Sequence, residues 1–523
     1  MLQIIPQTII SISSSYLLKT IITVADIEKF FDKESLVDCM LTLNKATIDH
    51  KCYRLWWKLN KRVEITIRTG VGTTEPVEVE GVVGQGTSGA SLVSQLNVDS
   101  GVNSYFVGSI DEAFYGSVRL QPLLFMDDCI RLASGVREAQ AGNIKLSYAL
   151  KEKLLTYHKS KSIYMVYGTT KYKKKVEQEV EDFPLTLGDI ILQKKSQQKY
   201  LGDILDDRGL GASVEATVKS REGKTRRGIY ELRSVCHDFR AQILGGMTGA
   251  LALWETCILS SLLTNCGTWV DIREDTIKRC EALQNLFLLV ILKLPHSTPS
   301  LACRAMCGVL SVRVRIMREK LRLVVAIRNL SEETLAKQIF KEQQEMGLPG
   351  LVKEAQEICK KIGISDVTEE NVTTEEMEEA FAMFNLKMTK DEMGDKKKYK
   401  DMKNDDIRKP QKFIEKMNIE ECSVAMRVKC FMVDCPGNMK ARYKGREVCL
   451  KCKLKPGLQG PAMRETQEHL EICEGYSKLR EGRDLDDFDD KVAYFVEVIK
   501  EREKMLINIR KAMEKKQRKE KRS

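Results

Sequence analysis

Two adjacent carboxylates, Asp127 and Asp128, are the residues of this chain whose type and spacing best suit chemistry. The apolar run Leu123–Met126 precedes them and the largely apolar run Cys129–Ala133 follows, so the pattern predicts a strand, a tight turn and a strand. Neighbouring carboxylates repel each other, and a bound cation relieves that repulsion. Mg²⁺ prefers oxygen ligands and usually takes one or two carboxylates together with substrate phosphates. A plain polar turn explains the same dipeptide, so other residues must decide between the two.

A third carboxylate, Asp26, ends the apolar run Ile21–Ala25, which is rich in β-branched residues and predicts a strand. A phosphoryl-transfer site with two metal ions, which lie about 3.5–4 Å apart, needs such a carboxylate on an adjacent strand. The alternative for Asp26 is a helix N-cap. The glycine-rich element Gly84-Gln85-Gly86 lies between Asp26 and Asp127 in the chain, and an ordinary glycine turn is its alternative.

The periodicity of apolar residues predicts an α+β protein with several domains. The first part mixes helices with a mainly antiparallel sheet, and the pattern becomes helical from about Val214 to Asn329. The expected domains are a remnant N-terminal segment, a sheet domain, a helical domain, a charged helical linker, a cysteine-rich module, and a final helix with a basic tail, at 1–20, 21–210, 211–329, 330–420, 421–480 and 481–523.

Composition sets limits on the class of protein. The 523 residues carry 85 Lys and Arg against 74 Asp and Glu, a net charge of +11, which is compatible with a nucleic-acid partner but not diagnostic of one. The sixteen cysteines lack regular disulfide-like spacing and follow no signal peptide, so we expect a reducing location, nuclear and cytoplasmic. No apolar run is long enough to span a membrane, and only five histidines disfavour a histidine-based nucleophilic triad.

Taken in order, five segments resemble the palm motifs of reverse transcriptases. They are Val24–Asp32 for the first motif, Val83–Gly89 for the second, Leu124–Asp128 for the tyrosine-x-Asp-Asp box with Phe125 in place of tyrosine, His158–Gly168 for the fourth, and Lys199–Gly202 for the primer grip. The chain looks most like the polymerase of retrotransposons that lack long terminal repeats. The resemblance covers about residues 20 to 480 and is sharpest from 24 to 134.

This resemblance implies a right-hand polymerase palm followed by a helical thumb. It implies that Asp26, Asp127 and Asp128 hold two Mg²⁺ ions. The 3′-hydroxyl of a DNA primer, paired with an RNA template, would then attack the α-phosphate of a deoxynucleoside triphosphate. Phe31 would crowd a ribose 2′-hydroxyl, with a core helix position as its alternative. Gln85 would lie near the template and the incoming base pair. Lys161 would stabilise the pyrophosphate, with a solvated lysine as its alternative, and the primer grip would comprise Tyr200, Leu201 and Gly202.

A second constellation, Cys449-x2-Cys452-x16-His469-x3-Cys473, has the spacing of a structural zinc site. Two thiolates from one Cys-x2-Cys turn, with His and Cys one helical turn apart, make a closed tetrahedral set. Four unrelated residues are the alternative. Such modules bind single-stranded RNA or structured ends. A basic cluster at the start of the helical domain, from Lys219 to Arg227, reads either as phosphate contacts or as a solvated charged face.

Only about 25 residues precede Asp26, too few for the fingers subdomain of reverse transcriptases. We therefore expect an N-terminally truncated element, with any endonuclease upstream of residue 1. The main alternative is a catalytically inactive remnant that binds nucleic acid through its thumb and zinc module. A template-independent nucleotidyltransferase is a more distant alternative, because the primer-grip and thumb features would then have no role.

Overall fold

The computed structural model describes residues 19–28, 30–46, 48–80, 89–106, 113–237, 246–296, 298–347, 349–394, 399, 408–430, 449, 451 and 466–520. The segment 1–18 and the element Gly84-Gln85-Gly86 lie outside these ranges, and so does Cys452. The predictions made for Gln85 and Cys452 therefore remain predictions.

A five-stranded sheet forms the centre of the N-terminal part, in the order β13-β10-β1-β9-β8. The strands are β1 (Lys19–Asp26), β8 (Leu123–Phe125), β9 (Asp128–Ala133), β10 (Ile163–Gly168) and β13 (Gln193–Lys194). All neighbours pair antiparallel except β10 and β13, which are parallel. The α+β class predicted from the sequence is confirmed, and the sheet is mixed rather than antiparallel throughout.

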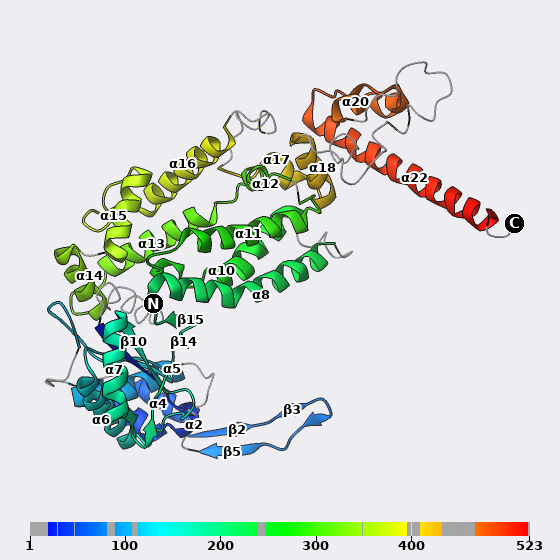
Figure 1. Cartoon of the computed structure of the whole chain (residues 1–523). Coiled ribbons are helices and arrows are strands. Elements are labelled where there is room, and N and C mark those ends of the chain that lie inside the picture. Colours follow the sequence, from blue (N-terminus) through cyan, green and yellow to red (C-terminus); the bar gives the residue numbers. More distant parts are fainter. Residues whose placement is uncertain are drawn as a thin grey trace.

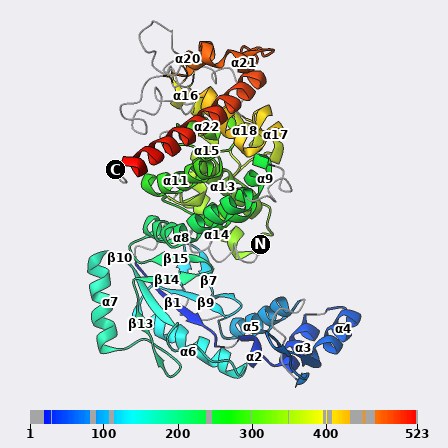
Figure 2. The ribbon, with the colours of Figure 1, turned by 90° about the vertical axis from the view of Figure 1, so that its right-hand side faces the viewer.

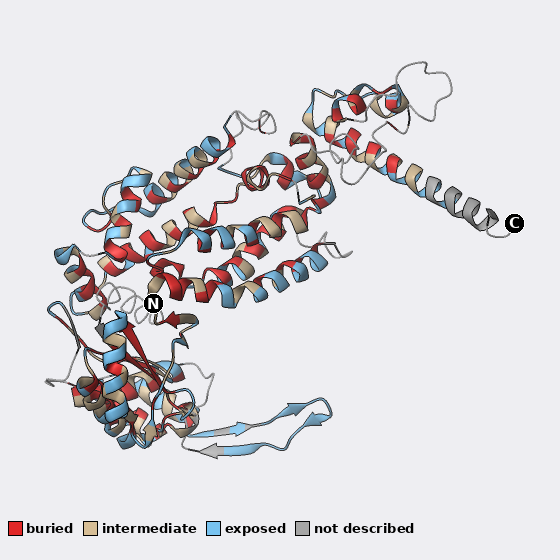
Figure 3. Ribbon diagram, viewed as in Figure 1, coloured by how far each residue is buried: buried red, intermediate tan, exposed pale blue. Residues whose placement is uncertain are grey.

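Strand β1 is covered on both faces because its apolar side chains alternate. Ile21 and Ala25 join a cluster with helix α6 (Val136–Glu152) and helix α5 (Ala90–Phe106). Ile22 and Val24 point to the opposite face and join a second cluster, which includes residues from far along the chain. The strand is therefore buried throughout its apolar part, and Figure 3 shows the central strands in red.

Several smaller elements surround the sheet. Helices α2 (Phe30–Lys33), α3 (Leu36–Lys45) and α4 (His50–Asn60) follow β1, and α7 (Thr170–Asp182) packs against β10. Two-stranded hairpins are formed by β2 (Arg62–Ile65) with β5 (Val77–Glu80), β3 (Arg68–Thr69) with β4 (Gly72–Thr73), β6 (Ala113–Tyr115) with β7 (Val118–Leu120), β11 (Thr186–Leu187) with β12 (Ile190–Ile191), and β14 (Gln197–Tyr200) with β15 (Asp203–Asp206). The arm formed by β2 and β5 projects from the body of the protein (Figure 1).

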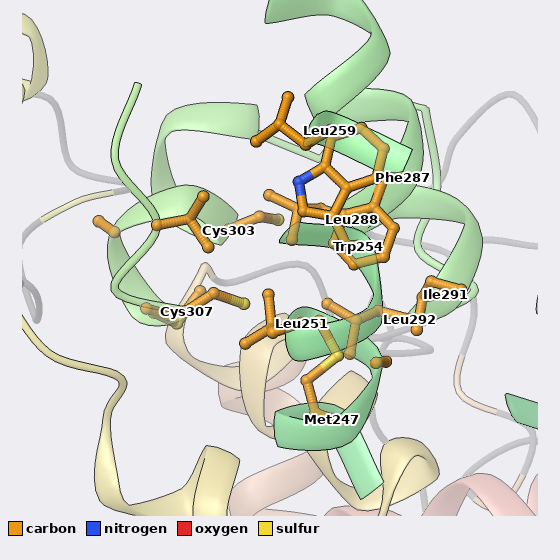
Figure 4. Packing of buried hydrophobic residues seen from close by; sticks show 14 of the residues in the cluster. Met247, Leu251, Trp254, Leu259, Phe287, Leu288, Ile291, Leu292, Cys303 and Cys307 are labelled. Carbon is orange, nitrogen blue, oxygen red and sulfur yellow. The ribbon is translucent and has the colours of Figure 1, made fainter. Parts of the chain in front are cut away.

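A helical part lies above the sheet and contains the largest apolar cluster. It comprises α8 (Leu210–His237), α9 (Gly246–Leu253), a π-helical turn (Trp254–Leu259), α10 (Ser260–Leu262), α11 (Glu274–Ile291), α12 (Ser300–Met306) and α13 (Val312–Arg328). At its centre the rings of Trp254 and Phe287 stack with centroids 4.5 Å apart, and both residues are fully buried (Figure 4). The predicted switch to helical structure after residue 210 is therefore observed.

The segment predicted as a charged linker, residues 330 to 420, is instead largely part of the packed structure. Helices α14 (Leu335–Met346), α15 (Leu351–Ile362) and α16 (Thr374–Met393) bury Phe340, Leu351 and Phe381 in the cluster that covers one face of the sheet. On α16 the acidic residues Glu375, Glu376 and Glu379 are exposed, whereas Met377 and Phe381 of the same helix are buried. Helix α16 begins with a capping box, in which the side chains of Thr373 and Glu376 each accept a hydrogen bond from the other residue's backbone N–H group.

The C-terminal part consists of α17 (Lys412–Lys416), α18 (Ile419–Lys429), α20 (Gln467–Ile472), a 3₁₀ turn (Glu474–Tyr476), α21 (Ser477–Arg480) and α22 (Phe488–Glu520). Helix α22 extends away from the body (Figure 1). The basic tail predicted from Arg510 is the end of this helix as far as Glu520. No helix among the described residues has the length and apolar character of a membrane span.

Truncation of a core side chain tests whether the 330–394 helices belong to the folded core. Phe340→Ala is expected to lower the free energy of unfolding by about 3–5 kcal/mol, because its ring is only 1% exposed. Phe183→Ala, at a side chain that is 75% exposed, is the matched control. Urea unfolding followed by circular dichroism measures both, and equal midpoints for the two variants would mean that the segment is a linker after all.

Candidate active site

Three carboxylates meet at one end of the two central strands. Asp26 is the last residue of β1 and pairs directly with Asp128, the first residue of β9. Directly opposed residues of antiparallel strands have Cα atoms roughly 4.5–5.5 Å apart and share one face of the sheet. Asp127 occupies the two-residue turn between β8 and β9. The structure therefore brings Asp26 close to Asp127 and Asp128, which lie about a hundred residues further along the chain.

The turn that carries Asp127 has an unusual backbone conformation. Met126, its first residue, has φ +54°, whereas Asp127 has no positive φ, a combination typical of a type II′ turn. Glycine is preferred at that first position, and a side chain there costs about 1–3 kcal/mol unless its surroundings enforce the conformation. The turn thus carries local strain next to the carboxylates.

Gln95 of α5 holds this turn in place. Its Oε1 accepts a hydrogen bond from the Met126 backbone N–H at 2.6 Å, and its Nε2 donates to the Leu124 carbonyl at 3.1 Å. A backbone bond from the Ile27 N–H to the Asp127 carbonyl, 2.8 Å, ties the turn to the chain beyond β1. Sequence reasoning missed Gln95, because nothing local shows that this helical position faces the turn.

Asp26 is fixed by the loop before β10. Its backbone carbonyl accepts from the His158 N–H at 2.8 Å, and its carboxylate accepts from Lys161 Nζ, which lies 3.2 Å from both oxygens. The alternative role of Asp26 as a helix N-cap is wrong, because α2 begins four residues later, at Phe30. Lys161 is likewise more than a solvated lysine: its side chain is 55% exposed, but its ammonium group faces the site.

The negative charges of the three aspartates act on one another, as expected of a site that attracts cations. Partial burial, followed by the charges of Asp127 and Asp26, raises the pKa of Asp128 from its ordinary 3.8 to about 6. Lys161 and Lys199 act in the opposite direction on the pKa of Asp128. A donor set made only of carboxylate oxygens, open to solvent at Asp127, suits Mg²⁺, whose remaining ligands are usually water and phosphate.

The oxygen atoms of the three carboxylates are too far from one another to bind a single ion together. Within the described part of the chain, only Cys449, His469 and Cys473 bring three ligand atoms within 4.8 Å of one another. The three aspartates lie outside that limit, and Lys161 supplies the positive charge beside Asp26. Cation binding here therefore requires side-chain rotation, which the exposed position of Asp127 permits.

The residues predicted as a primer grip belong to the β14–β15 hairpin and its turn. Tyr200 is 1% exposed, and burial followed by the nearby Cys129 and Asp128 raises its pKa far above the ordinary value. Leu201 and Gly202 form the turn of the β14–β15 hairpin, with φ values of +45° and +89°. Positive φ at both turn residues is typical of the type I′ turns that connect twisted hairpin strands.

Phe31 has contacts that fit its structural alternative. It is half-buried on α2, meets Phe30 edge to face with centroids 5.2 Å apart, and packs against two apolar clusters. Its predicted role near the sugar of a nucleotide stays a prediction.

Three of the four predicted zinc ligands meet in the C-terminal part. Cys449, His469 and Cys473 are buried, with their ligand atoms within 4.8 Å of one another. The two sulfur atoms are 3.7 Å apart. Tetrahedral zinc with Zn–S bonds of about 2.3 Å places two thiolates about 3.8 Å apart, so the pair fits zinc far better than it fits a disulfide.

The basic cluster at the start of α8 serves in part inside the protein. Arg221 is only 12% exposed and binds groups of the protein itself. Lys219 and Arg226 form ion pairs with Glu215 and Glu222 on the same helix. The phosphate-contact interpretation is therefore wrong for Arg221.

Comparisons with solved structures give distant matches to this chain. No family model matches the chain, and no curated protein matches it. Among solved structures it is similar to telomerase from Candida albicans in complex with a TWJ fragment of telomeric RNA, at 12% identity and a TM-score of 0.32. The match covers 70% of this chain and 53% of the telomerase chain, so the chain spans about half the length of that protein. So distant a match does not establish a common fold.

Removing the Asp128 charge should stabilise the metal-free chain at high pH. Because the pKa of Asp128 is raised by folding, this residue binds more protons in the folded chain than in the unfolded chain between pH 3.8 and about 6. The free energy of unfolding therefore falls as pH rises through that range. Asp128→Asn is therefore expected to gain about 1–2 kcal/mol at pH 8 in EDTA, after allowance for solvent screening, and nothing below pH 4. Thermal unfolding measures this, with Asp189→Asn, at an exposed hairpin turn, as control. An unchanged midpoint for Asp128→Asn at pH 8 would contradict the electrostatic account.

Metal analysis tests the cysteine–histidine cluster. The purified chain is expected to carry about one zinc ion, and His469→Ala or Cys473→Ser to carry none. Cys52→Ser, at an exposed thiol of α4, should retain the metal. Chelation should also expose the buried cysteines around residues 449 to 473 to thiol reagents. A metal-free chain in which these thiols stay protected would exclude the zinc site.

Proposed function

We propose that the chain is an RNA-directed DNA polymerase module of the kind found in retrotransposons without long terminal repeats, which extends a DNA primer on an RNA template. The observation that carries this proposal is the pairing of Asp26 with Asp128 on adjacent strands, with Asp127 in the adjoining turn. Three carboxylates at one sheet end are the donor set of two-metal nucleotidyl transfer. The order of the five sequence motifs supports the same reading.

In this proposal the residues act mainly by positioning and by charge. Asp26, Asp127 and Asp128 would hold two Mg²⁺ ions, which supply activation of the primer hydroxyl and neutralisation of the triphosphate. Lys161 would leave Asp26 as cations bind and turn toward the pyrophosphate, a short movement for an exposed lysine. The Gln95 contacts keep the strained turn, and with it Asp127, in one place.

Nucleic acid would lie between the sheet and the helices. The β14–β15 turn, next to Asp128, would support the primer end, and Phe31 would exclude a ribose 2′-hydroxyl. The zinc module near residues 449 to 473 would add contacts to RNA. The net charge of +11 favours such a polyanionic partner.

One observation favours the second candidate, a non-catalytic protein that only binds nucleic acid. The three carboxylates do not lie within ligand distance of one another, and an ammonium group already neutralises Asp26. If metal ions cannot displace the Lys161 ammonium group from Asp26, the chain would still bind nucleic acid but would not transfer nucleotides.

Primer extension separates the two candidates. The chain with Mg²⁺, an RNA template and a DNA primer is expected to add deoxynucleotides, and Asp127→Asn to reduce the rate at least ~100-fold, because metal-ligand charge is lost at the reacting centre. Asp189→Asn serves as a charge-matched control on the same domain. Extension by the unaltered chain that is no greater than by Asp127→Asn would refute the polymerase, and retained RNA binding by both would support the second candidate.

A further inference from the structure

A single side chain, Arg221 of α8, connects the β14–β15 turn to the helical part. Its Nη2 donates to the Gly202 carbonyl at 2.8 Å and to Asp203 Oδ1 at 2.5 Å. Its Nη1 donates to the carbonyls of Leu262 and Thr264 at 3.0 and 2.9 Å. One guanidinium on α8 therefore bonds to two other segments: the hairpin turn, and the end of α10 with the residues just after it.

The groups around Arg221 complete a network. Asn265 Nδ2 lies 3.4 Å from both the Leu201 carbonyl and Asp203 Oδ2, and the Trp269 ring centroid lies 5.9 Å from the guanidinium carbon. We call Arg221, Asp203, Asn265 and the Leu201-Gly202 turn the junction network. Leu201, Gly202 and Asn265 all have positive φ, a conformation that persists in non-glycine residues only where surroundings enforce it.

Polar contacts, rather than tight packing, set the geometry here. A cavity of about 40 Å³ lies beside the network, lined by Tyr200, Asp203, Thr217 and Trp269 among others. Asp203 is 14% exposed, and burial raises its pKa to about 6 in spite of Arg221. Loss of the guanidinium would leave a buried carboxylate and three carbonyls without their donor, which is costly.

The network also lies between the carboxylates and α8. Tyr200, the residue before the turn, is close enough to Asp128 for that charge to act on its pKa. Strand β15 packs along α8, with a hydrogen bond from the Ile204 N–H to Thr217 Oγ1 at 2.8 Å, and Figure 2 shows β14 and β15 beneath α8. Movement of the turn relative to α8 would therefore change the distance from α8 to the active site.

We propose that Arg221 is a positioning residue that fixes the β14–β15 turn relative to α8, so that a template–primer duplex lying along α8 reaches the three carboxylates at a set distance. The inference that the ligand is such a duplex rests on the function proposed above. Arg221 acts through Gly202 and Asp203 and does not itself touch nucleic acid. Its planar fork is required, because a lysine ammonium cannot donate to four acceptors in these directions.

The positional part is testable without any activity. Spin labels on Ser196→Cys, an exposed residue before β14, and on native Cys257, an exposed thiol of the helical part, report the distance from hairpin to helices. Cys52 and Cys435 are replaced by serine in this background. A narrow distance distribution is expected for the parent and a broadened or shifted one for Arg221→Lys. Arg226→Lys, at an exposed ion pair on the same helix, should match the parent. An unchanged distribution for Arg221→Lys overturns the proposal.

Duplex binding tests the consequence for the ligand. Arg221→Lys is expected to weaken the Kd for an RNA–DNA primer–template about 10-fold, as measured by fluorescence anisotropy. Arg313→Lys, at an ion pair of α13 with Glu274, should stay within about 2-fold of the parent. Asp203→Asn, which keeps the shape and removes the charge, should weaken binding less. The double variant Arg221→Lys/Asp203→Asn should be no weaker than Arg221→Lys alone, because both changes act on one contact. A shifted distance with unchanged duplex affinity overturns the role in positioning. If the parent chain does not extend primers, but Arg221→Lys changes both the spin-label distance and the duplex affinity, the polymerase function is refuted and the positioning role of Arg221 is supported.

Discussion

The antiparallel pairing of β1 with β9 is the constraint on which the candidate site depends. A slip of one residue would move Asp26 to the other face of the sheet, away from Asp128. The same slip would move Ile22 and Val24 into the cluster that now holds Ile21 and Ala25, and Ile21 and Ala25 into the other, so both closely packed clusters would have to rearrange. Burial of these side chains on both faces therefore fixes the register, and the register places the carboxylates.

Backbone strain is concentrated around this sheet end, and single polar side chains hold it in place. Met126 and Leu201 both have positive φ in turns next to the carboxylates. Gln95 binds the backbone at Leu124, before the first turn, and at Met126, the first residue of that turn; Arg221 binds the carbonyl of Gly202, in the second turn. These turns cost energy locally, and the large apolar clusters of the sheet and helices supply the stability that maintains them.

The helices from 335 to 393 show how distant segments complete the sheet domain. Phe340 and Phe381 pack in the same cluster as Ile22 of β1, more than three hundred residues away. The face of the sheet opposite α5 and α6 is thus covered by chain that follows the helical part. The cysteine–histidine cluster, by contrast, lies in a small satellite cluster with Tyr494 and Phe495 of α22, so its stability depends more on local contacts and on bound metal.

The sequence by itself determined the elements and the residue types of the site. The apolar, β-branched run Ile21–Ala25 predicted β1, and the apolar runs around Asp127 predicted β8 and β9. The spacing of Cys449, His469 and Cys473 predicted a cluster that the structure brings together. Tertiary structure alone decided what these residues contact. Gln95 at the turn, Arg221 inside the junction network, and the burial of the 335–393 helices all depend on pairs far apart in the chain. Local periodicity reports which face of an element is apolar, but not which other element covers it.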